Sequence, residues 1–241
     1  MHAFIYYGCM KSRALNLKTP KNVDELKALY KDNELVYYTP MEEFINTLTH
    51  GAGAVFAAIF MIFMLLKSST PAAYVTSVLT GLCLCAEFAI SAAYHGVSDI
   101  KKKRVMRRID FPAVNLNVIA CGTGLCLLYR NLYGYIAFGL SFVIGIAMLF
   151  LCLHDFRRFH NVSVISNFVI GGLLFAAFFV AYFSPIGMPP VAVYLYLAGL
   201  IACLIGAILF GIHIRYAHCV FHVFVLAGPI LIVLSTYFQL T

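Results

Sequence analysis

Apolar residues run almost unbroken along this chain after residue 43, and only short polar stretches interrupt them. Seven such runs occupy roughly residues 44–66, 72–95, 112–129, 132–153, 162–183, 189–211 and 218–238. Most are close to the ~20 residues that an α-helix needs to cross a bilayer. The hydrophobicity is continuous and does not alternate along each run as it does in a membrane β-barrel. The pattern therefore predicts an all-α membrane protein, a bundle of seven transmembrane helices.

The composition agrees with this prediction. Of the 241 residues, 62% are hydrophobic and 11% are charged, and the mean hydropathy is +0.89. That leaves too little polar surface to cover a soluble globule of this length, which excludes a soluble enzyme. We expect residues 1–40 to form a cytoplasmic amino-terminal segment, with a short interfacial helix over residues 24–30. Residues 41–241 are expected to form the seven-helix transmembrane domain.

Lysine and arginine gather at one end of the predicted spans. Six precede residue 44, six lie between the second and third runs, and only Lys67 and Arg130 fall on the opposite side. Because basic loops stay in the cytoplasm, the amino terminus is expected inside and the carboxyl terminus outside. The formal charge of +7 then reflects topology and an attraction of the basic loops to anionic lipid heads. No feature besides this charge points to nucleic acid.

Four residues far apart in the sequence fall at the same, cytoplasmic end of these runs. His95 closes the second run, Asp110 opens the third, and His218 and His222 open the last. Imidazoles are good zinc ligands, and two of them at i and i+4 share one face of a helix. A lone histidine near a helix end is more often a plain interfacial residue, but this pair predicts a metal site. Ser91 lies one turn deeper than His95 and suits a supporting contact.

Asp110 leaves two interpretations open. Its carboxylate is a candidate hydrogen-bond acceptor and base for a zinc-bound water. It would serve equally well in a salt bridge to Arg107 or Arg108.

Two further polar features point to the same end. Glu43, Asn46 and His50 share one helical face where the first run begins, so they are candidates to orient the metal-site helices through hydrogen bonds. An acidic helix start, favourable at the positive end of the helix dipole, explains the glutamates as well. Glu87 is spaced at i, i+4 and i+8 with Ser91 and His95, about 12 Å deeper by helical rise. A carboxylate there is expected to be protonated or hydrogen-bonded, and to line a polar cavity.

Taken together, these segments resemble a known family. The motifs are E-E-x-x-N-x-x-T-H-x-x-G from residue 42, S-x-x-x-H from residue 91, R-R-I-D from residue 107, and H-x-x-x-H from residue 218 followed by F-V-L-A-G. They are similar to those of the hemolysin III-like membrane proteins, which belong with the progestin and adipoQ receptors (PAQR), including the adiponectin receptors, and more distantly with alkaline ceramidases. The sequence departs from the pattern at Pro112 and Glu87, which affects the expected shape of the cavity more than the metal.

The resemblance implies a site and an activity. His95, His218 and His222 would hold zinc, Asp110 would contact it through a water, and Ser91 would support them. The relation to ceramidases implies a zinc-dependent hydrolase of a lipid amide or ester at the cytoplasmic side. A receptor or sensor of lipid composition with a structural zinc is the alternative, and a pore-forming, hemolysin-like protein is a third.

The expected partner is a lipid or fatty acid within the membrane. The expected location is the plasma membrane, with several passes. The sequence leaves the oligomeric state open.

Overall fold

The computed structural model describes residues 22–212 and 214–240. These residues form eight α-helices and no strand: α2 (Val23–Asp32), α3 (Pro40–Lys67), α4 (Pro71–Gly96), α5 (Ile100–Leu127), α6 (Leu132–His154), α7 (Phe156–Tyr182), α8 (Pro190–Phe210) and α9 (Ala217–Gln239). Helices α3 to α9 are all long and apolar enough to cross a membrane. The prediction of an all-α bundle with seven transmembrane helices is confirmed.

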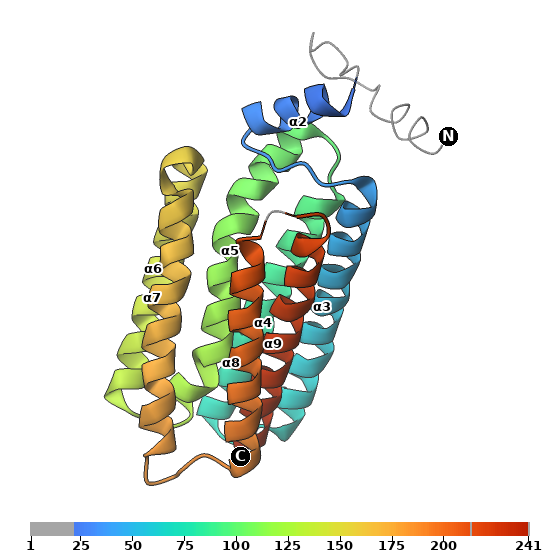
Figure 1. The fold of residues 1–241 in the computed structure, drawn as a ribbon. Coiled ribbons are helices and arrows are strands. Elements are labelled where there is room, and N and C mark those ends of the chain that lie inside the picture. Colours follow the sequence, from blue (N-terminus) through green and yellow to red (C-terminus); the bar gives the residue numbers. More distant parts are fainter. Residues whose placement is uncertain (1–21, 213, 241) are drawn as a thin grey trace.

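The helices run side by side, with neighbours in sequence packed together. The pairs α3 and α4, α4 and α5, and α8 and α9 make the most extensive contacts, and α9 also packs on α3 and α5 (Figure 1). Helices α6 and α7 pack on each other and on the flank of α5. This arrangement brings α9 close to α4 and α5, which are far from it in the sequence; these three helices carry the predicted site. The short α2 lies across the end at which α5 begins (Figure 1).

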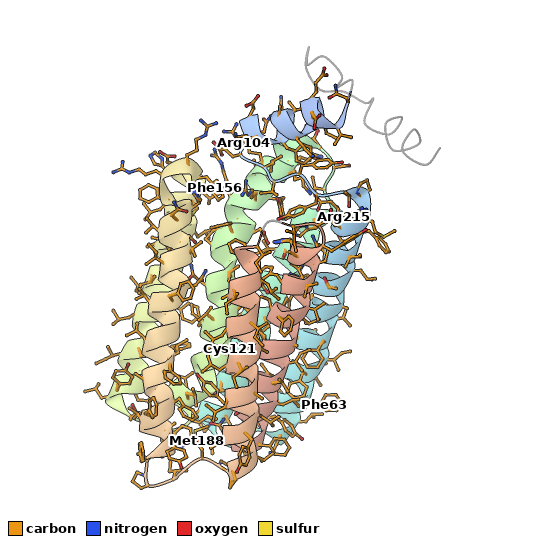
Figure 2. All side chains as sticks on the ribbon, viewed as in Figure 1. Phe63, Arg104, Cys121, Phe156, Met188 and Arg215 are labelled. Carbon is orange, nitrogen blue, oxygen red and sulfur yellow. The ribbon has the colours of Figure 1, made fainter. Side chains whose placement is uncertain are left out.

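Large apolar side chains cover the outside of the bundle. Leu66, Leu132 and Phe150, for example, are each more than 60% exposed. In water such a surface would be unfavourable, whereas hydrocarbon solvates it. Arg104 and Arg215 lie near the α2 end, whereas Phe63 and Met188 lie near the other (Figure 2). The chain is therefore an integral, multi-pass membrane protein.

Polar residues fix where the spanning helices begin. The Thr39 side chain and that of Glu42 cap each other's backbone N–H groups at the start of α3, and Pro40 occupies the first turn. The side chains of Thr70 at the start of α4 and Asp99 at the start of α5 each accept a hydrogen bond from a backbone N–H of the first turn. Such caps satisfy N–H groups that lack a partner within the helix. They set the register of each helix, and so the depth of the residues that it carries.

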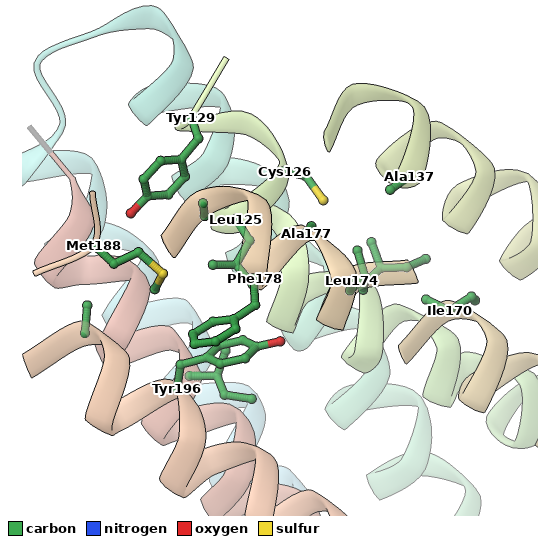
Figure 3. Packing of buried hydrophobic residues seen from close by; sticks show 14 residues of the cluster. Leu125, Cys126, Tyr129, Ala137, Ile170, Leu174, Ala177, Phe178, Met188 and Tyr196 are labelled. Carbon is green, nitrogen blue, oxygen red and sulfur yellow. The ribbon is translucent and has the colours of Figure 1, made fainter. Parts of the chain in front are cut away.

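The half of the bundle away from α2 holds a tight apolar core. Phe178 of α7 stacks on Tyr196 of α8 with ring centroids 4.9 Å apart, and Leu125 and Met188 pack beside them (Figure 3). Rings packed in this way hold α5, α7 and α8 at fixed distances. The polar residues of the site lie towards the other end, where α2 is.

Two expectations about boundaries differ in outcome. The short helix expected over residues 24–30 is confirmed as α2. The third apolar run begins at residue 112, but α5 begins at Ile100, because Asp99 caps it and the lysines and arginines that follow favour helix. The division of the chain at residue 40 into a segment and a domain remains a prediction, and residues 1–21 lie outside the described part.

Candidate metal centre

Three histidines from two helices meet near the α2 end of the bundle. One ring nitrogen each of His95, His218 and His222 lies within 4.8 Å of the others. The Nε2 atoms of His218 and His222 are 3.1 Å apart. Two imidazoles bound to one tetrahedral zinc would have nitrogens about 3.3 Å apart, so this spacing is close to that of a shared ion. The cluster is able to hold a metal ion.

The ring of His95 is oriented by α3. Glu43 Oε2 lies 2.7 Å from His95 Nδ1, and Asn46 Nδ2 lies 3.4 Å from the same nitrogen. A carboxylate at Nδ1 makes that nitrogen the N–H donor and leaves Nε2 with a free lone pair, the usual arrangement of a metal-ligating histidine. His95 is only 3% exposed, so the lone pair faces the interior of the bundle.

Glu43 is in turn held by a buried lysine. Lys103 Nζ, on α5, lies 2.9 Å from Glu43 Oε1 and donates to the backbone carbonyls of Tyr94 and Val97. Lys103 is 1% exposed. A buried charge needs a full set of partners, and these carbonyls come from the end of α4, where a cation is favourable. Lys103 therefore ties α3, α4 and α5 together directly behind His95.

A second glutamate of α3 positions the histidine pair of α9. Glu42 Oε1 accepts a 2.8 Å hydrogen bond from the backbone N–H of Tyr216, two residues before His218. Tyr216 has a left-handed backbone with φ of 62°, and no side chain caps α9. Glu42 thus supplies the anchor for the start of this helix. Consecutive glutamates of α3 hold the two sides of the cluster: Glu42 at α9, and Glu43 at His95.

Two aromatic rings support the imidazoles from either side. The ring of Tyr38 stacks on His218, with centroids 4.7 Å apart and planes at 20°. The ring of His50 stacks on His222, with centroids 3.9 Å apart. Neither ring nitrogen of the buried His50 has a hydrogen-bond partner among the described residues. Burial raises the pKa of the Tyr38 phenol far above its usual range, so this ring stays neutral at physiological pH.

Asp110 is not among the three converging ligands. Its carboxylate neighbours Ser91, one turn below His95 on α4. The salt bridge to Arg107 or Arg108 is absent from the part of the chain that the structure describes, where both arginines contact Glu34 instead. The water-mediated role of Asp110 stays a prediction.

Glu87 lies deeper on the same face of α4, and both Glu87 and Ser91 are buried. The carboxylate of Glu87 accepts a 3.2 Å hydrogen bond from Asn117 Nδ2 of α5. The hydrogen bond expected from the sequence is therefore present. Its part in a polar cavity remains a prediction.

Sequence reasoning missed Tyr38, Glu42 and Lys103 as parts of the site. Lys103 was expected to be one charge of a basic loop, and nothing in the run Lys101–Arg104 distinguishes the buried member. Glu42 was accounted for as a cap, which it also is. Tyr38 lies between two helices, where no periodicity marks the side that faces the histidines.

A family model described as Haemolysin-III related matches residues 38–233, which include all three histidines. The chain belongs to this family. The haemolysin-III relationship extends to a protein of Bacillus cereus named Hemolysin-3, which is 27% identical over 192 residues, 78% of this chain and 86% of that protein. No solved structure matches the chain. The resemblance inferred from the four motifs is thus confirmed at the level of the family.

Proposed function

We propose that this haemolysin-III family member is a zinc-dependent hydrolase that cleaves a lipid amide or ester at the cytoplasmic side of the membrane. The observation that carries the proposal is the convergence of three imidazoles, with a carboxylate nearby that is not a ligand. A structural zinc site has four protein ligands, whereas a catalytic site keeps one position open. Three histidines beside Asp110 fit the second description.

The donor set suits zinc. Three neutral imidazoles with no thiolate among them are typical of zinc, and the Glu43–His95 pair supplies the carboxylate that usually supports such a ligand. The Nε2 of buried His222 faces the Nε2 of His218 at 3.1 Å, so Nε2 is the nitrogen that would bind the ion. When bound, zinc would polarise a substrate carbonyl and acidify a water.

The remaining chemistry belongs to side chains of the chain itself. The Asp110 carboxylate would take a proton from the attacking water and return it to the leaving amine or alcohol. The Ser91 hydroxyl, beside Asp110, would hold that carboxylate in place. His95, fixed by Glu43, would keep the cluster in position while charge develops. The surrounding apolar helices would limit the entry of bulk water.

Metal content and hydrolysis measured on the same purified preparations test this proposal. The Asp110→Asn variant should keep about one zinc per chain and lose at least about 100-fold in the release of fatty acid from N-acyl or ester lipids, because it lacks only the base. The His222→Ala variant should lose both zinc and hydrolysis. Elemental analysis measures the first quantity and mass spectrometry of the released fatty acid the second.

The same pair of variants separates catalysis from a structural role for the metal. If zinc only holds α4 and α9 together in a lipid sensor, Asp110→Asn should leave every function intact and His222→Ala should lower the melting temperature. Undiminished hydrolysis in Asp110→Asn, or full zinc content in His222→Ala, would contradict the proposal.

A further inference from the structure

Residues 33–39, which join α2 to α3, form a strap across the cytoplasmic end of the bundle. One end of the strap carries Glu34 and the other carries Tyr38, the ring that stacks on His218. Between them, Leu35 is buried in a small apolar cluster with Tyr30 and Tyr94. The strap therefore links the surface around Glu34 to the metal centre. Glu34 lies outside the residues that the family model matches.

Three guanidinium groups converge on the single carboxylate of Glu34. Arg104 and Arg108 of α5 each approach it at 2.9 Å, and Arg157 of α7 approaches at 3.1 Å. Arg107 donates to the backbone carbonyl of the same residue. One negative charge is thus held by a group of four cations from two helices.

Each oxygen of Glu34 accepts two hydrogen bonds from the three guanidinium groups, so the donors are satisfied, but three positive charges face one negative charge. Guanidinium forks match the oxygens of a phosphate group, which carries three acceptor oxygens and up to two negative charges. The site is also within reach of solvent and lipid head groups, since the side chain of Arg157 is 70% exposed and that of Arg104 is 39% exposed. A phosphate would therefore neutralise the cluster better than Glu34 does.

Glu34 is held there in an unfavourable backbone conformation. Its φ of 62° lies in the left-handed region, which a residue with a side chain rarely adopts. Although burial alone would raise the pKa of the Glu34 carboxyl, the hydrogen bonds and charges of Arg104 and Arg108 lower it from 4.5 to about 2. The carboxylate is thus ionised at neutral pH, and a competing anion is able to replace it at the arginines.

We infer that Arg104, Arg108 and Arg157 form a binding site for a phosphate monoester, which displaces Glu34 and loosens the strap from the histidines. The expected ligand is the phosphomonoester head group of an anionic lipid, or a free phosphate ion of the same chemistry. Loosening the strap would move Tyr38 away from His218. Its consequence for substrate access rests on the proposed hydrolase function, whereas the binding itself does not.

A single fluorophore at residue 38 reports how exposed the strap is. The chain contains no tryptophan, so Tyr38→Trp introduces the only indole. The full-length variant is placed in phosphatidylcholine vesicles, and in vesicles that also contain phosphatidic acid or phosphatidylserine at equal surface charge. Quenching of the indole by acrylamide should rise with phosphatidic acid and respond much less to phosphatidylserine, which lacks a phosphomonoester. Inorganic phosphate added to phosphatidylcholine vesicles tests whether the free ion binds. A rise in quenching with phosphatidic acid alone identifies the lipid head group as the ligand, and a rise with both sources shows that the phosphate group is sufficient. Either result supports the site.

Matched variants in the same background test the residues. Arg157→Gln should weaken the response to phosphatidic acid about tenfold through loss of a charge-assisted hydrogen bond, and because Arg157 is largely exposed this variant should fold. Arg158→Gln removes the same charge from a neighbour that lies over the Phe159 ring, and it should change little. Glu34→Gln should raise quenching without any phosphate, whereas the exposed Asp24→Asn should not.

Equal effects of Arg157→Gln and Arg158→Gln would overturn the inference, as would equal responses to the two anionic lipids, or unchanged quenching throughout. The readout involves neither zinc nor hydrolysis. A protein that fails as a hydrolase would still show the response, so the two failures are distinguishable.

Discussion

At the scale of single residues, the centre depends on side chains that do not touch the metal position themselves. Glu43 fixes the tautomer and direction of His95, and Lys103 keeps Glu43 in place. Supporting carboxylates of this kind typically contribute 10–100-fold to metal affinity. The histidines provide the nitrogens, but α3 determines whether those nitrogens converge.

Replacing this carboxylate tests its contribution. Glu43→Gln should lower zinc affinity by about 10–100-fold, because a neutral amide holds the His95 N–H less firmly. Competition with a chromophoric chelator measures the affinity of purified protein. Asp32→Asn, which removes an exposed carboxylate at the same end, is the matched control and should bind zinc normally. Equal affinities of Glu43→Gln and the unaltered protein would show that Glu43 does not orient the ligand.

Sequence reasoning reached part of this residue-scale description. The i and i+4 spacing of His218 and His222 places both on one face of any helix, so the pair was predictable without a structure. The meeting of His95 with that pair required the correct number of spans, which the apolar runs supplied. Lys103 and Tyr38 were not predictable, because their roles depend on which neighbouring helix or strap lies against them.

At the scale of helices, close approach of backbones holds α9 in place. A Cβ atom on Gly228 would come within 2.4 Å of Cys203 Sγ and 3.0 Å of the Gly199 carbonyl oxygen of α8. Small residues at such positions let membrane helices pack through van der Waals contact, since lipid provides no hydrophobic force between them. The start of α9 is held by Glu42 and its middle by Gly228, so His218 and His222 have a defined orientation. The sequence predicted the span but not this crossing, because each run is apolar on all sides and does not show which face is packed.

Adding a single methyl group at Gly228 tests this packing. Gly228→Ala should destabilise the protein by about 1–3 kcal/mol, because the added carbon meets the backbone of α8 and neither helix can yield. Thermal unfolding in detergent measures the change in melting temperature. Gly172→Ala provides the control: its Cβ would meet nothing within 4 Å, so the substitution should be neutral or stabilising by up to about 1 kcal/mol. Similar melting temperatures for the two variants would contradict a close α8–α9 contact.

At the scale of the whole molecule, most basic side chains and the three-histidine cluster lie at the same end of the bundle. The strap, the arginine cluster and the three histidines all lie at the α2 end, and among the described residues only Lys67 and Arg130 are lysines or arginines at the opposite end. Because basic loops tend to remain inside, we expect the three-histidine cluster at the cytoplasmic face. A substrate would then approach from the inner leaflet.

Labelling from one side of the membrane tests this orientation. Lys101→Cys and Ile186→Cys place a thiol in a connection at each end, and a membrane-impermeant maleimide is applied to intact cells. Ile186→Cys should react in intact cells, and Lys101→Cys should react only after the cells are opened. Labelling of the unaltered protein measures the background from its natural cysteines. The reverse pattern would move the centre to the outer face.

Zinc-edge X-ray absorption of the purified protein tests the central claim most directly. The account predicts about one zinc per chain, with three imidazole nitrogens at about 2.0–2.1 Å and an oxygen in the remaining position. In His222→Ala this signal should disappear or lose a nitrogen. A metal-free protein that is folded and stable, or a zinc spectrum that His222→Ala leaves unchanged, would contradict the three-histidine centre.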